Sequence, residues 1–333
     1  MISVEPTTEV KLSHRAWRVA IAETGHIAAI SKEGLATLLA PDHVTPRSFS
    51  ISADASDAAL SATGDMLAVA ARGKLVLIST TTFRPVHRWD ESTEACCFLP
   101  GDALWTASRW DEDSVALEVR EPDTWKVVAR AELKDPFDNS SFMMRPHSDG
   151  EYVAILAAAG QDGQSLFWAH RDGSRIGVDR FPGLEDTRLP SPLPAGKQFL
   201  AICDGNELRR YKFPLGPLEG TMAWPFDDME NQIGDRVSCV DSDRALLSSL
   251  TDRLYLVDLR KMEIADEVWL CGHEPRPAAE VYPKLRNSRR LCYDLGHFEP
   301  LRAGSLVSIH SELKRDSHDS VLTWRVPSLG KVR

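Results

Sequence analysis

The sequence has no long apolar run and no excess of basic residues. Its longest plainly apolar stretch, residues 153–159, is far shorter than the roughly 20 residues that a membrane-spanning helix needs. Residues 1–14 lack a basic start followed by an apolar core, so we expect no secretory signal. The formal net charge is -10, whereas phosphate binding draws on clustered Lys and Arg. We therefore expect a soluble, cytoplasmic protein with neither a membrane nor a nucleic acid as its partner.

Sequence motifs of common enzymes are also missing. The chain contains no GxSxG, no phosphate-binding GxxxxGK[ST] or GxGxxG, and no HExxH or HxH. The acidic runs Asp111-Glu112-Asp113 and Asp227-Asp228 offer carboxylate oxygens for a cation, but nothing nearby spaces the remaining ligands, so we interpret both as solvated loops. We accordingly expect no catalytic residue, no cofactor and no metal site.

The cysteines show no CxxC pair. Several of them lie in apolar, strand-like segments, which indicates packed and reduced thiols rather than a disulfide framework or a zinc site. Only the adjacent pair Cys96-Cys97 deserves a test of reactivity. The six cysteines are Cys96, Cys97, Cys203, Cys239, Cys271 and Cys292.

What the sequence does contain is a repeated pattern. In residues 251–274, two alternating apolar segments, 254–259 and 268–270, flank a polar turn and are followed by Gly272-His273, which is typical of a strand, a hairpin and a second strand. Weakly similar copies recur along the chain, several with a Gly-Asp or Asp-Gly turn between strands. The predicted units span roughly residues 16–50, 58–90, 94–134, 141–182, 188–224, 236–271 and 291–333.

Seven units of about 40 residues, each long enough for four short strands, predict an all-β fold. We expect a single seven-bladed β-propeller over residues 1–333, with four-stranded antiparallel blades. The last unit ends soon after its third strand, and residues 8–13 form a spare strand at the start of the chain. We predict that this N-terminal strand completes the last blade and closes the ring, which would place both termini in the seventh blade.

Two stretches, residues 254–274 and 320–331, resemble the WD-repeat family. In that family a third strand ends in an aromatic-Asp pair, and a Gly-His pair follows the fourth strand. Val257-Asp258, Trp324-Arg325 and Gly272-His273 occupy those places, so we interpret Gly272-His273 as a structural turn rather than a ligand. The pattern is degenerate elsewhere, because Ile78-Ser79, Val119-Arg120 and Tyr211-Lys212 stand at the aromatic-Asp positions.

The resemblance implies that the loops between second and third strands, and those between blades, share one partner-binding face. Long or charged connections fall mostly at these joints, namely residues 109–114, 159–164, 225–236, 273–290 and 313–320. Tyr and Arg are enriched at the energetic centres of interfaces. The candidate partner-binding residues are Arg109, Trp110, Asp111, Phe226, Asp227, Asp228, Tyr282, Lys284, Leu285, Arg286, Arg289, Arg290, Lys314 and Arg315.

Two functions remain open on the sequence alone. The first is a non-catalytic scaffold or regulatory subunit that binds a protein partner within a hetero-complex. The alternative is a propeller enzyme or small-ligand-binding protein with a site in the central channel. The residues expected to line that channel are apolar or small, which favours the scaffold; they are Val19-Ala20, Ala58-Ala59, Ala95-Cys96, Phe142-Met143, Pro192-Leu193, Val237-Ser238 and Cys292-Tyr293.

Overall fold

The computed structural model describes most of the chain as short β-strands. The described residues are 1–42, 44–109, 111, 113–137, 140–160, 163–182, 187–194, 196–203, 206–226, 233–249, 253–272, 276–277, 291–292, 295–301, 304–310 and 320–329. None of these residues lies in an α-helix. The chain divides into two compact units, an N-terminal unit (His14–Leu189) and a C-terminal unit (Met1–Ser13 with Pro190–Arg333).

The N-terminal unit begins with two four-stranded antiparallel sheets. Each strand pairs with its neighbour in the sequence, as expected when short turns join alternating apolar strands. The first sheet holds β3 (Arg18–Ile21), β4 (Ile27–Ile30), β5 (Leu35–Leu39) and β6 (Pro46–Ser50). The second holds β7 (Ala55–Leu60), β8 (Met66–Ala71), β9 (Lys74–Ser79) and β10 (Arg84–Trp89).

Two further groups of four antiparallel strands complete the N-terminal unit. A single parallel pair, Arg130 with Arg175, joins their outer strands into an eight-stranded sheet. The first group holds β11 (Thr93–Phe98), β12 (Leu104–Arg109), β13 (Ser114–Arg120) and β14 (Val127–Lys134). The second holds β15 (Ser141–Pro146), β16 (Tyr152–Ala158), β17 (Gln164–Asp172) and β18 (Arg175–Arg180).

The C-terminal unit contains three larger sheets and a two-stranded one. Its first sheet holds β19 (Ser191–Pro192), β20 (Gln198–Cys203), β21 (Glu207–Lys212) and β22 (Leu218–Ala223). The second holds β23 (Ile233–Cys239), β24 (Arg244–Ser249), β25 (Leu254–Asp258), β26 (Glu263–Leu270) and β1 (Ile2–Val4). The third holds β29 (Leu295–Leu301), β30 (Ser305–His310), β31 (Ser320–Arg325) and β2 (Thr8–Lys11), while β27 (Arg276–Pro277) pairs with β28 (Leu291–Cys292).

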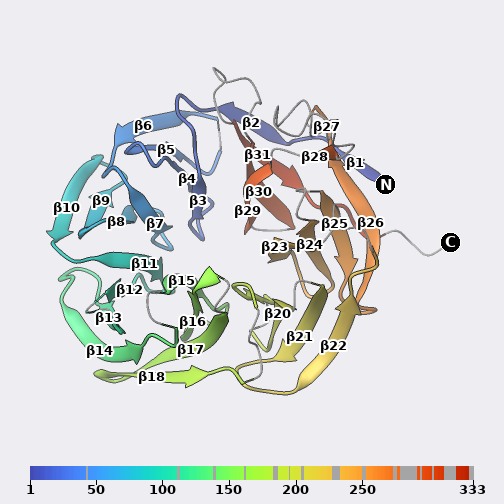
Figure 1. The fold of residues 1–333 in the computed structure, drawn as a ribbon. Coiled ribbons are helices and arrows are strands. Elements are labelled where there is room, and N and C mark those ends of the chain that lie inside the picture. Colours follow the sequence, from blue (N-terminus) through green and yellow to red (C-terminus); the bar gives the residue numbers. More distant parts are fainter. Residues whose placement is uncertain are drawn as a thin grey trace. The chain divides into compact units, whose positions relative to one another are not determined.

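The N-terminal strand completes the last sheet, as predicted. Figure 1 shows β2 beside β31, and the two strands are antiparallel with Val10 opposite Val321. The prediction that both termini lie in this sheet is wrong for the N-terminus. Before β2, strand β1 pairs in parallel with β26, with Ile2 opposite Val268, because Ile2 and Val4 pack against the apolar cluster that includes Leu270.

Glycine is required at two of the predicted turns. Gly64 has a φ of 79°, and a Cβ there would lie 2.4 Å from Nδ1 of His26. Gly150 has a φ of 78°, and its Cβ would lie 3.0 Å from Cγ of Pro100. Both residues therefore occupy left-handed turns that pack closely against a neighbouring side chain.

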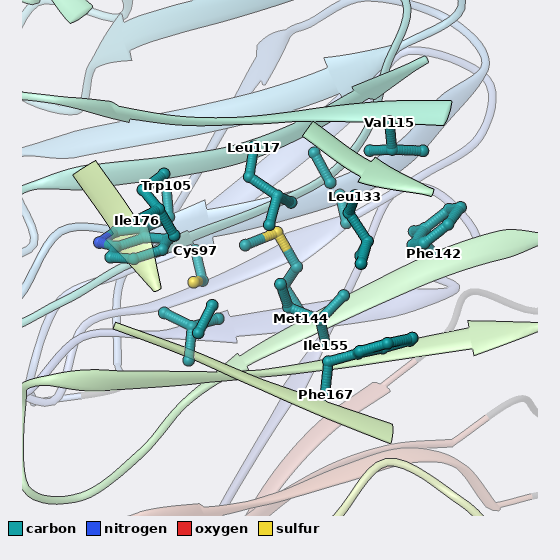
Figure 2. Close-up of a cluster of buried hydrophobic side chains, with 14 of the residues drawn as sticks. Cys97, Trp105, Val115, Leu117, Leu133, Phe142, Met144, Ile155, Phe167 and Ile176 are labelled. Atoms are coloured by element: carbon teal, nitrogen blue, oxygen red, sulfur yellow. The ribbon is translucent and has the colours of Figure 1, made fainter. Parts of the chain in front are cut away.

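The strands hold together through apolar side chains between neighbouring sheets. Figure 2 shows the cluster between β11–β14 and β15–β18, where Trp105, Leu117, Met144 and Ile155 converge. Trp105 is 0% exposed. Because burial stabilises in proportion to the apolar area removed from water, such clusters make each sheet a fixed support for its loops.

Two sequence interpretations in the C-terminal unit need correction. The connection assigned to residues 225–236 is shorter, because β23 already begins at Ile233, whose side chain packs in the cluster with Met222 and Trp224. Cys292, predicted with Tyr293 on the first strand of the last sheet, is not on that strand, and Tyr293 lies outside the described residues. That strand, β29, begins at Leu295, and Cys292 lies in β28.

Candidate functional site

Arg109, at the end of β12, joins the following β12–β13 loop, one of the connections that the sequence associates with partner binding, to the connection between β14 and β15. Its Nε donates to Oε1 of Glu94 at 2.8 Å, and its Nη1 lies 3.1 Å from Oδ2 of Asp135. Its Nη2 donates to the carbonyl oxygen of Ser140, and its guanidinium lies 5.4 Å from the ring centre of Phe142. The side chain of Arg109 is 18% exposed and that of Asp135 is 0% exposed. This arginine is therefore a structural centre rather than a free surface charge.

Asp135 continues the network into the connection between β14 and β15. Its carboxylate accepts hydrogen bonds from the backbone N–H groups of Phe137 at 3.1 Å and Ser140 at 2.7 Å. Its own N–H donates to the carbonyl of Asp113 at 2.8 Å. The β12–β13 loop and the β14–β15 connection thus lie against each other at one end of these sheets, an arrangement that the family resemblance implies.

The contacts between Arg109 and Asp135 shift the pKa of both side chains in the direction that favours their charged forms. Burial raises the pKa of Asp135, but hydrogen bonds from Ser140, Phe137 and Arg109 outweigh it and hold that pKa below its ordinary value of 3.8. Burial lowers the pKa of Arg109, but its hydrogen bonds with Glu94 and Asp135 outweigh this effect and raise it. Both partners are therefore charged at neutral pH, and each stabilises the charge of the other.

Asp111 has a local structural contact. Its Oδ1 accepts hydrogen bonds from the N–H of Asp113 at 2.9 Å and from the hydroxyl of Ser114 at 2.8 Å, which closes the turn before β13. Phe226, in the C-terminal unit, packs against Trp224 and Tyr255, each with ring centres 5.2 Å from its own. A role of Arg109, Asp111 or Phe226 in partner binding stays a prediction.

The other candidates lie outside the described residues, so the structure neither brings them together nor separates them. They are Trp110, Asp227, Asp228, Tyr282, Lys284, Leu285, Arg286, Arg289, Arg290, Lys314 and Arg315.

A buried charged group that the sequence analysis missed is Asp57, on the first strand of its sheet. Asp57 is 1% exposed and lies 2.9 Å from Nη2 of Arg18. Its carboxylate also accepts from the N–H groups of Ala58 at 2.7 Å and Cys96 at 3.0 Å, and burial raises its pKa despite the Arg18 charge. The acceptor contacts and complete burial make Asp57 a bridge between β7 and β11.

The same type of bridge recurs between other first strands. Oε2 of Glu94 in β11 accepts from the N–H of Phe142 in β15 at 3.2 Å. Oγ of Ser191 in β19 accepts from the N–H of Cys239 in β23 at 3.0 Å. The signal in the sequence is a polar residue near the start of an otherwise apolar first strand, and its role is to satisfy a backbone donor of the next sheet.

Within the part of the chain that the structure describes, no three His, Cys, Asp or Glu side chains come together in a way that would hold a metal ion. No helix among the described residues is long and apolar enough to cross a membrane.

Cys96 and Cys97 are expected to resist alkylation in the folded protein. Both are buried, and burial followed by the nearby Asp57 carboxylate raises the pKa of each thiol above 9.0. The reactive species is the thiolate. Native protein treated with iodoacetamide at pH 8 should be modified at the half-buried Cys271 before either residue, as read by peptide mass spectrometry. Modification of Cys96 at the rate seen in denatured protein would contradict this.

Comparison with known proteins identifies the fold of the chain but does not identify a sequence family. No protein-family model matches the chain, and no curated protein matches its sequence. Among solved structures, the chain is similar to the Cps50 (Swd1) β-propeller domain of Myceliophteria thermophila, with a TM-score of 0.65 and 13% identity. The match covers 97% of this chain and 99% of that domain. Together with the four-stranded antiparallel groups of the described residues, it shows that the chain has the β-propeller fold.

Proposed function

We propose that the protein is a non-catalytic interaction module, acting as a scaffold or regulatory subunit of a cytoplasmic hetero-complex. It binds a protein partner through the loops between second and third strands and the connections between blades. The proposal includes no cofactor and no catalytic residue.

The observation that carries this proposal is the Arg109 network. It fixes the β12–β13 loop against the β14–β15 connection through buried charged contacts to Asp135 and Glu94. Loops that are already ordered lose less conformational entropy when a partner binds, so more of the contact energy appears as affinity. An ordered loop face on rigid sheets therefore suits recognition of a second protein.

The test is quantitative affinity capture of the full chain from its source cells. The wild type is compared with the double variant Tyr282→Ala/Arg286→Ala and with Lys126→Ser, a change at an exposed residue between the third and fourth strands β13 and β14, away from the proposed loop face. We expect one or more proteins to co-purify in stoichiometric amount with the wild type and with Lys126→Ser. The double variant should lose them by about tenfold or more, as truncation of an interface centre costs at least 1.4 kcal/mol, roughly a factor of ten.

The affinities of the purified wild type and variants for the purified partner, measured by surface plasmon resonance, should then follow the same order. Circular dichroism checks that the variants are folded. A stoichiometric partner that the double variant retains would contradict the assignment of the loop face. A chain that captures no stoichiometric protein would contradict the interaction module itself.

A further inference from the structure

Three arginines lie on the outer strands of the first two sheets of the N-terminal unit. Arg47 lies on β6, and Arg84 and Arg88 lie on β10; all three are exposed, and no described residue forms an ion pair with them. Elsewhere in this unit, Arg18, Arg109 and Arg120 each contact a carboxylate within 3.1 Å. In a chain with net charge -10, unpaired cations on two neighbouring strands call for an explanation.

The strand registers place two of these arginines on facing sides of two sheets. Arg47 is directly opposite Leu38, and Arg88 is directly opposite Val76. Leu38 and Val76 belong to the same apolar cluster between the sheets. Because directly paired residues point to the same side of a sheet, Arg47 and Arg88 both lie along the outer edge of this inter-sheet cluster. Figure 1 shows β6 and β10 as the outermost strands of the two sheets.

Two aromatic side chains lie against the same inter-sheet cluster, and one of them contacts Arg47. The rings of Phe49 and Phe83 are 5.0 Å apart, and both pack partly buried against the inter-sheet cluster. The guanidinium of Arg47 lies 5.9 Å from the ring centre of Phe83. We call the set Arg47, Phe49, Phe83 and Arg88 the rim strip. It combines two cations with a half-buried apolar floor, all within the N-terminal unit.

The residues of the rim strip favour binding of a partner through side-chain contacts over pairing of a partner strand with the backbone of β6 or β10. Charges and proline on an outer strand oppose edge-to-edge pairing, and β10 carries Pro85 and a register break between Pro85 and His87. Edge protection alone, however, does not need an aromatic floor. A guanidinium stacked on an aromatic ring presents its N–H groups sideways, which suits a carboxylate.

We propose that the rim strip docks a short, extended, acidic segment of a partner protein, with carboxylates on Arg47 and Arg88 and an apolar side chain on Phe49 and Phe83. Two arginines beside one aromatic pair favour isolated carboxylates over a nucleic acid, whose binding draws on many clustered cations. The site goes beyond the proposed function, because it lies on outer strands and involves none of the loop-face candidates.

The test uses the full chain and a fluorescein-labelled peptide, Glu-Thr-Leu-Thr-Glu-Thr-Leu-Thr-Glu. In an extended peptide, alternate residues share one side, so Glu and Leu face the strip together. We expect saturable binding by fluorescence anisotropy in 50 mM salt, weakened about tenfold or more by Arg47→Ser and by Arg88→Ser, since each loses a charge-assisted contact. A matched peptide with Gln in place of Glu should lose binding similarly.

Arg72→Ser is the matched control, because Arg72 is an exposed arginine of the same sheet with no ion pair to a described residue. Equal weakening by Arg72→Ser would overturn the proposal and indicate general attraction of an acidic peptide. Tighter, Arg88-dependent binding of single-stranded oligothymidylate would also overturn it. The variant Tyr282→Ala/Arg286→Ala should bind the peptide like the wild type, so this result stands apart from the test of the loop face.

Discussion

Deletion of residues 1–12 is expected to lower the midpoint of thermal unfolding by about 10–20 °C. The deletion removes β2, which covers the edge of β31, and takes away the buried side chains of Val10 and Leu12. Burial of two such side chains and the strand hydrogen bonds is worth about 5 kcal/mol. For a domain of this size each kcal/mol shifts the midpoint by roughly 2–4 °C. Differential scanning calorimetry measures the shift.

The control is deletion of residues 1–5, which removes β1 but keeps β2. This shorter deletion loses the partly buried Ile2 and Val4 and the ion pair between the N-terminal amine and Asp266. It should lower the free energy of unfolding by only about 1–2 kcal/mol and the thermal midpoint by a few degrees, because β26 remains paired with β25. An uncovered β31 should also promote aggregation of the longer deletion. Equal midpoints for both deletions would contradict a structural role of β2.

Arg109→Ala is expected to reduce the free energy of unfolding by about 3–5 kcal/mol, since it leaves the buried carboxylate of Asp135 without its cationic partner. Glu94 loses the same partner. Equilibrium unfolding in urea at pH 7 measures the change. Arg130→Ala is the matched control, because Arg130 is 48% exposed and its Nε lies 3.5 Å from Glu118, a contact worth at most about 1 kcal/mol.

The pH dependence tests whether Asp135 contributes to that loss. Its pKa in the folded protein lies below the ordinary value of 3.8, so its ionisation stabilises the wild type above pH 3.8. That stabilisation is lost as the pH falls through the lower, folded-state pKa. The difference between wild type and Arg109→Ala should therefore shrink below about pH 3.8. A difference that stays the same at pH 2 and pH 7 would contradict the assignment.

The sequence predicts the sheets well because local chemistry specifies them. Short apolar runs separated by turns define β8 and β9, and the turns at Gly64 and Gly150 need the left-handed backbone that glycine adopts readily. The spare N-terminal strand was recognisable because the last unit is one strand short. These features depend on neighbours within a few residues, which a single sequence displays directly.

The parts that sequence reasoning missed depend on distant partners or broken patterns. Strand β1 has three residues, too few to show a period, and its partner β26 begins about 260 residues later. Gly234 and Asp235 resemble a turn in the sequence, yet they lie within strand β23, which begins at Ile233. The pairing of β23 with β24 shifts its register between Ile233 and Val237, and this irregularity hides the strand from a pattern search. Asp57 similarly resembles a turn residue ahead of Ala58-Ala59 until its contact with Arg18 is known.

The sequence shows where charged connections lie, but it does not show the contacts that Arg109 makes. Arg109 ends β12, and its carboxylate partners Glu94 and Asp135 are 15 and 26 residues away in the sequence. A sequence shows that a charge is present but does not show which opposite charge folds against it. The exposed Arg47 and Arg88 went unnoticed for the converse reason, since nothing in their sequence neighbourhood shows that they lack a partner.

The pairing of β2 with β31 also governs when this protein finishes folding on the ribosome. Thr8 and Thr323, whose hydroxyl groups are 2.5 Å apart, are separated by 315 residues. At roughly 5–20 residues per second, synthesis of that distance takes about 15–60 s. For all that time β2 lacks its partner strand, and it can pair only after β31 has been translated. Nascent chains stalled before Ser320 should therefore expose this N-terminal segment to chaperones and proteases, whereas released chains protect it.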